Sequence, residues 1–120
     1  MSSERTFIFN GRKDINEFVI PDCYTKIGEY SFCKCSSLTN ITIPNSVTSI
    51  DKYAFNNCSS LTNIIIPNSA TSIGKYVFSE CSSLTKAYVP SIFKSIKNVF
   101  PKNCKLEDQI LNNQNIIDNF

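Results

Sequence analysis

The chain lacks several residue types that enzymes commonly use. Among its 120 residues there is no histidine and no tryptophan, and there are only three glycines and one methionine. Without histidine, the side chain that most often acts as a general acid or base near neutral pH is missing. The sequence contains neither a glycine-rich phosphate loop nor a Gly-x-Ser-x-Gly motif. We therefore expect no catalytic activity and predict no catalytic residue.

Long apolar runs and one-sided charge are also absent. No window approaches the ~18 apolar residues of a membrane-spanning helix, and residues 1–9 lack the apolar segment of a signal peptide. The 12 basic and 10 acidic residues give a net charge of +2 and are scattered, without the basic run that favours nucleic-acid backbones. We predict a soluble cytoplasmic protein with no membrane insertion and no nucleic-acid partner.

What the chain does contain is an internal repeat. Prolines, isoleucines and cysteines each recur at intervals of 23 residues, at Pro21, Pro44, Pro67 and Pro90, at Ile27, Ile50, Ile73 and Ile96, and at Cys35, Cys58, Cys81 and Cys104. A period of roughly 20 to 29 residues is typical of a solenoid, in which each repeat forms one rung that stacks on its neighbours.

Each repeat divides into two halves. The first, such as Leu38–Pro44, alternates isoleucine with polar residues and ends in proline, which predicts a short strand with one buried face. The second places apolar residues four apart, at Ile50, Ala54 and Cys58, which predicts one or two helical turns. We therefore expect an α/β solenoid with a short parallel β-sheet on one face and short helical or 3-10 segments on the other.

The regular repeats do not fill the chain. They run through residues 14–106, as about three full units and one partial unit, and a stack of rungs leaves apolar surface at both ends. We expect residues 1–13 to form an N-terminal cap with a strand near Thr6. Residues 107–120 are expected to form a C-terminal cap or tail. A capping helix is our first interpretation there, and a degenerate last strand or a frayed tail are the alternatives.

The six cysteines have to be assigned to disulfides, to a metal site or to the core. Four of them share one repeat column beside a recurrent phenylalanine, which is the environment of a small buried apolar residue. Cys33 and Cys35 form a single C-x-C pair, so with no second pair and no histidine a zinc site is not expected. We predict reduced, packed thiols, no metal and no cofactor, although neighbouring rungs lie close enough for disulfides between them.

The repeat unit carries a family resemblance. Leu38–Leu61 closely follows L-x-x-I-x-I-P-x-S-V-x-x-I-x-x-x-A-F-x-x-C-S-S-L, a pattern that resembles the BspA-like leucine-rich repeat proteins. That family is known from bacterial surface proteins and parasitic protists, where it is associated with attachment to host proteins and cells. The resemblance implies a leucine-rich-repeat solenoid that binds proteins without catalysis. We predict a protein–protein interaction module, with a cell-surface adhesion protein as the alternative.

The strands also indicate where a partner would bind. If Ile41 and Ile43 point into the core, the residues between them point outwards and recur along the sheet. We predict two outward, partner-binding columns, which are Glu17, Asn40, Asn63 and Lys86, and Val19, Thr42, Ile65 and Tyr88. Apolar residues in the second column indicate a contact surface, although the same residues also favour strands for their own sake.

Two further surfaces offer alternatives. Tyr30, Tyr53 and Tyr76 recur at the same interval, and we expect them to close the edge of the core with their hydroxyls in water rather than to face a partner. An exposed end of the short solenoid, or the face around Ile65 and Tyr88, is a candidate surface for a homodimer.

Overall fold

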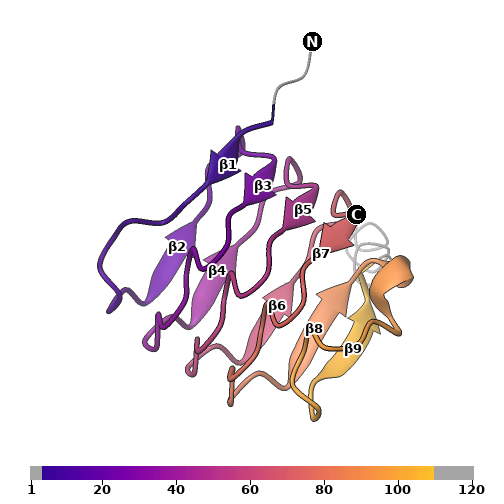
Figure 1. Cartoon of the computed structure of the whole chain (residues 1–120). Helices are drawn as coiled ribbons and strands as arrows, with labels where there is room; N and C mark the ends of the chain where they lie inside the picture. Colours follow the sequence, from indigo (N-terminus) through magenta and orange to yellow (C-terminus); the bar gives the residue numbers. More distant parts are fainter. Residues whose placement is uncertain (1–3, 110–120) are drawn as a thin grey trace, which may run out of the picture.

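The computed structural model describes residues 4–109, which form a short solenoid of stacked rungs (Figure 1). No helix in this range is long and apolar enough to cross a membrane. All the strand pairs are parallel, because the chain returns to the same place once per repeat. The elements are β1 (Thr6–Phe7), β2 (Glu17–Val19), β3 (Lys26–Ile27), β4 (Asn40–Thr42), β5 (Ser49–Ile50), β6 (Asn63–Ile65), β7 (Ser72–Ile73), β8 (Lys86–Val89), the 3-10 helix η1 (Ser91–Phe93) and β9 (Lys105–Asp108).

The regular repeats place one strand on each of two faces. On one face β1, β3, β5 and β7 pair in that order, so that Phe7, Ile27, Ile50 and Ile73 occupy one column. The other face carries longer strands and is divided into a pair, β2 with β4, and a group of three, β6, β8 and β9. The predicted solenoid and its parallel strands are confirmed.

A stack of phenylalanine rings runs through the interior from rung to rung. The ring centroids of Phe32 and Phe55 lie 5.1 Å apart, those of Phe55 and Phe78 5.4 Å, and those of Phe78 and Phe100 5.0 Å. Phe9 continues the stack at the N-terminal end, 4.8 Å from Phe32. Each inner ring is covered by the rings of both neighbouring rungs, so the apolar interior is continuous, as the repeat predicts.

The cysteine column lies inside the same core. Cys35, Cys58 and Cys81 are buried, which confirms their predicted packing, whereas Cys104, the fourth member of the column, is half-buried. The thiol of Cys58 donates a hydrogen bond to the carbonyl oxygen of Phe32 at 3.2 Å, and Cys81 repeats the contact with Phe55 at 3.1 Å. These bonds give the buried thiols partners in the preceding rung. All six cysteines lie among the described residues, and each is a free thiol.

The second half of the repeat is not helical, which corrects our prediction of helical turns on that face. Tyr53 and Asn57 have φ values of 61° and 65°, and this left-handed backbone interrupts a right-handed helix. The N–H group of Phe55 donates to Val77 in the next rung at 3.0 Å, and that of Asn57 donates to Ser79 at 2.9 Å. Because these donors bond between rungs, the segment forms turns, and the described fold is a β-solenoid with one short 3-10 helix.

Strands occupy both ends of the described region. β1 pairs with β3 and adds one rung to the first sheet at its N-terminal end. β9 pairs with β8 and adds one strand to the other sheet at its C-terminal end. This strand follows Cys104 directly, whereas residues 82–85 separate Cys81 from β8 in the preceding repeat. The capping helix predicted for the C-terminal segment lies outside the described residues, and the domain boundaries remain predictions.

Candidate protein-binding face

The outward residues of the longer strands form a single surface, which we call the outer face. The strand register places Glu17 beside Asn40 and Val19 beside Thr42. It likewise places Asn63 beside Lys86 and Ile65 beside Tyr88. Both columns therefore have the predicted outward orientation, and their binding of a partner remains a prediction. The outer face comprises Glu17, Val19, Asn40, Thr42, Asn63, Ile65, Lys86 and Tyr88.

Apolar side chains are accessible on this face. Val19 is 68% exposed and Ile65 is 46% exposed, whereas Tyr88 is half-buried. The ammonium of Lys86 lies 6.0 Å from the centre of the Tyr88 ring, a geometry compatible with a cation–π contact. Ile65 and Tyr88 are neighbours across β6 and β8, while Val19 lies beyond β4. The accessible apolar groups therefore fall on both sides of the centre of the face.

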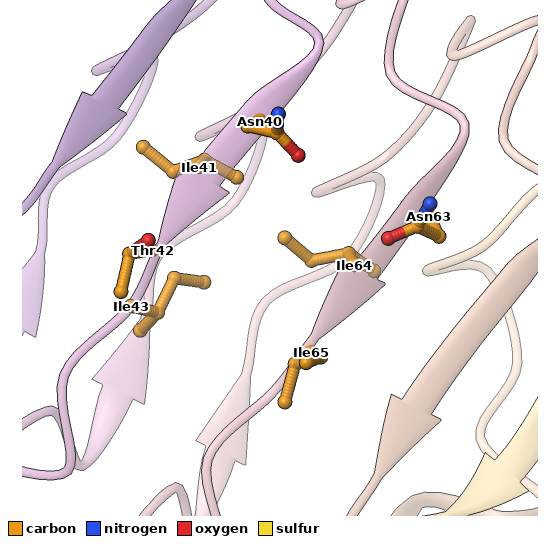
Figure 2. Close-up of a pocket in the computed structure, with 7 residues that line it drawn as sticks. All are labelled: Asn40, Ile41, Thr42, Ile43, Asn63, Ile64 and Ile65. Atoms are coloured by element: carbon orange, nitrogen blue, oxygen red, sulfur yellow. The ribbon is translucent and has the colours of Figure 1, made fainter.

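The outer face is interrupted between β4 and β6. These two strands belong to different sheets, although β5 and β7 of the same repeats are paired on the opposite face. Figure 2 shows the hollow between them, which has a volume of about 280 Å³ and is lined by residues 40–43 and 63–65. Ile41 points inwards but is only half-buried, in keeping with its place beside this hollow. The centre of the face is therefore a shallow depression with an apolar floor.

A row of threonine contacts is interrupted at the same place. The hydroxyl of Thr39 donates to the backbone carbonyl oxygen of Asn16 at 3.1 Å. The hydroxyl of Thr85 donates to the backbone carbonyl oxygen of Thr62 at 3.5 Å. The hydroxyl of Thr62 instead accepts a hydrogen bond from the side-chain amide of Asn63 at 3.2 Å. The facing edges of β4 and β6 thus lack the ladder that joins the other rungs, and their polar groups are accessible to water or a ligand.

The two ends of the outer face carry opposite charges. Glu17 lies on β2 at one end, and Lys86 lies on β8 towards the other. β9 extends the two columns by Lys105 and Glu107, whose side chains form an ion pair of 3.4 Å. Sequence reasoning missed these two residues. The repeat spacing could not have found them, because β9 follows Cys104 directly, whereas four residues separate Cys81 from β8.

The tyrosine ladder forms a separate surface. The rings of Tyr30 and Tyr53 stack with centroids 5.1 Å apart, and those of Tyr53 and Tyr76 stack at 5.5 Å. Each ring covers a face of its neighbour, and Tyr30 and Tyr76 at the two ends of the ladder are 50% and 42% exposed. This stacking supports the structural interpretation that we prefer for the ladder.

The outer face offers binding chemistry: side-chain amides, apolar groups and two separated charges. Within residues 4–109 no group of three or more histidine, cysteine, aspartate or glutamate side chains is placed to hold a metal ion. The arrangement is suited to contact with another macromolecular surface, because its groups are spread across the face rather than gathered around one reacting atom.

The stacked parallel strands and their open outer surface define a leucine-rich-repeat solenoid. The family model for the BspA type leucine rich repeat region matches residues 5–119, in six copies. The chain therefore belongs to the BspA-type leucine-rich repeat family, which confirms the resemblance seen in the repeat unit.

Two solved structures share the fold. A leucine-rich repeat protein from T. pallidum aligns with a TM-score of 0.53 and 21% identity over 78% of this chain. A leucine-rich repeat protein from Bacteroides ovatus ATCC 8483 aligns with a TM-score of 0.51 and 24% identity over 87% of this chain. The chain spans 56% of the first protein and 37% of the second. No curated protein sequence matches it.

Proposed function

We propose that the chain is a non-catalytic interaction module that binds a protein partner through its outer face. The observation that carries this proposal is the pairing of Ile65 with Tyr88, two apolar residues held in register on the outward side of β6 and β8. An outward strand position in water favours a polar residue, as Thr42 illustrates. Apolar and aromatic side chains at such positions are typical of contact surfaces.

The scaffold beneath the face supports the proposal. Ile64 and Ala87, which alternate with the outward pair, are buried in the core and fix the orientation of both strands. The partner would therefore meet a surface whose backbone is already ordered, which lowers the entropic cost of binding. Membership of a repeat family typical of binding proteins, and the lack of histidine in the sequence, support binding over catalysis.

A pull-down from source-cell lysate tests the proposal. Wild-type protein is compared with an Ile65→Lys/Tyr88→Lys double variant, which places two charges in the apolar pair. The matched control is Ser49→Lys/Ser72→Lys on β5 and β7, because lysine is already the natural residue in that column at position 26. Circular dichroism and thermal melting establish that both variants fold.

We expect a partner that is retained by the wild type and by the control and lost by the outer-face variant. Equal recovery by all three proteins would place the site elsewhere, at the tyrosine ladder or at the ends of the solenoid. The same experiment with host or matrix proteins as bait tests the alternative function in adhesion, for which the support is the family resemblance.

The cytoplasmic location stays a prediction, and protease treatment of intact source cells separates it from the cell-surface alternative. A cytoplasmic protein survives treatment that removes exposed surface proteins. Degradation of the chain under conditions that leave internal proteins intact would contradict the cytoplasmic prediction.

A further inference from the structure

The charges and amides of the outer face are arranged so that the face complements itself. From β2 to β8 the order along the first column is an acid, two amides and a base, which are Glu17, Asn40, Asn63 and Lys86, and Lys105 on β9 lies beyond them. Reading these four positions backwards gives a base, two amides and an acid. A second copy that lies on this face with its rungs in reverse order would therefore meet each group with its complement.

We propose that the partner of the outer face is a second copy of this chain, related by a two-fold axis that runs parallel to the strands between β4 and β6. This inference rests on the proposed function of the same face. Such an axis reverses the order of the rungs and keeps the two columns in register. It places Glu17 opposite Lys86 of the second copy, and Asn40 opposite Asn63 of the second copy.

The second column fits the same arrangement. Val19, which is more exposed than Ile65, lies opposite Tyr88 of the second copy. Ile65 lies opposite Thr42 of the second copy, at the mouth of the hollow between β4 and β6. Ile65 of each copy thus approaches the hollow of the other copy. The interruption between β4 and β6 therefore lies at the centre of the interface. The side-chain amides at positions 40 and 63 each offer donors and acceptors to one another.

The size of the face sets the strength that we expect. Its strands contain three or four residues each, so the contact is small and belongs with weak, concentration-dependent interactions. The two Glu–Lys pairs lie at its rim, where salt screens them. The dimer is therefore expected to form at high protein concentration and to weaken as ionic strength rises.

Sedimentation equilibrium at low ionic strength, over a wide concentration range, tests the proposal through charge reversal. Glu17→Lys and Lys86→Glu each replace two attractive pairs by two repulsive ones, and we expect each to raise the dissociation constant of the dimer by about tenfold or more. The double variant Glu17→Lys/Lys86→Glu restores both pairs with their signs exchanged. A mixture of the two single variants is also complementary and is expected to form a heterodimer.

The matched control is Lys105→Glu, which changes the net charge as much as Lys86→Glu does. Lys105 lies on β9, outside the four strands β2, β4, β6 and β8 that face the second copy. The effect of this substitution on dimerisation is therefore expected to be smaller. All these positions are exposed in the structure, and circular dichroism checks that the variants remain folded.

The expected result is a wild-type dimer that single reversals weaken and that the double variant and the mixture recover. Wild type that stays monomeric at the highest concentration would overturn the proposal, and so would single reversals that no second reversal rescues. If the chain is monomeric but a different protein is still lost with the Ile65→Lys/Tyr88→Lys variant, only the self-association fails and the proposed function stands.

Discussion

The rings of Phe32 and Phe55 lie parallel to within 2°, with their centroids 5.1 Å apart. Phe55 has a second such contact with Phe78, so its side chain joins three rungs of the solenoid. Rings of the two neighbouring rungs thus stack on the Phe55 ring. The stability of the stack is therefore a property of consecutive repeats together rather than of any single repeat.

The central ring of the stack should be the most sensitive to truncation. We expect Phe55→Ala to lower the free energy of unfolding by about 3–5 kcal/mol, because it leaves a cavity between two rungs. Phe100→Ala, at the half-buried end of the stack, should lower the free energy of unfolding by clearly less. Urea denaturation of both variants measures the difference. An equal loss at the two positions would contradict the continuous stack.

Neighbouring isoleucines on β6 and just after it should respond in opposite ways to a charge. Ile66 is fully buried and Ile65 is exposed, so we expect Ile66→Asp to unfold the domain and Ile65→Asp to leave it folded. Ile43, the equivalent buried residue one rung earlier, should behave as Ile66 does. Circular dichroism and thermal melting distinguish the outcomes. A folded Ile66→Asp variant with an unchanged melting temperature would show that the inward column is misassigned.

Two serines at equivalent repeat positions should differ in their contribution to stability. The hydroxyl of Ser69 donates to the carbonyl oxygen of Val47 at 2.6 Å, whereas the buried hydroxyl of Ser46 has no partner among the described residues. We expect Ser69→Ala to lower the free energy of unfolding by about 1 kcal/mol and Ser46→Ala to leave it nearly unchanged. Chemical denaturation of the pair measures this. A larger loss at position 46 than at position 69 would contradict the assigned hydrogen bonds.

The thiol at the end of the cysteine column should make stability depend on alkaline pH. Burial raises the pKa of Cys104 to about 11, above the value of about 8.5 expected in the unfolded chain. Between these values the unfolded chain loses a proton that the folded chain retains, so the stability from this group is complete below about pH 8.5 and falls as the pH rises towards 11.

Comparison of the wild type with Cys104→Ala isolates that effect from the titration of lysine and tyrosine. From neutral pH to about pH 10, the free energy of unfolding should fall by about 1 kcal/mol more in the wild type than in the variant. This figure allows for the partial exposure of the thiol. Urea denaturation at the two pH values measures the difference. Equal losses in the two proteins would show that the thiol at position 104 is not protected by the fold.

The sequence predicted the parts of this fold that repeat. The 23-residue interval set the strand register, and the alternation around Ile43 and Ile66 identified the buried and outward columns correctly. These features depend on side-chain pattern, which a repeat displays several times over.

The turns were predicted less well, because their cause lies in the backbone. Tyr53 adopts a left-handed conformation that nothing about a tyrosine side chain signals. The hydrogen bonds between rungs then take the donors that a helix would use, so the spacing of four residues was misleading.

The interruption of the outer face was equally hidden. Residues 38–43 and 61–66 differ only in having Thr42 in the first repeat and Ile65 in the second. Two nearly identical strands gave no reason to expect a hollow between them rather than a ladder. The hollow depends on how successive rungs are placed relative to one another, which no single repeat encodes.

The most direct test of the outer face as a contact surface is photo-crosslinking in source cells. A photoreactive phenylalanine analogue is incorporated at position 65 or, as the control, at position 72 on the opposite sheet. We predict a discrete adduct from position 65 and none from position 72, and the mass of the adduct distinguishes a second copy of the chain from another protein. An adduct from position 72 alone, or the same products from both positions, would contradict the assignment of the outer face as the binding surface.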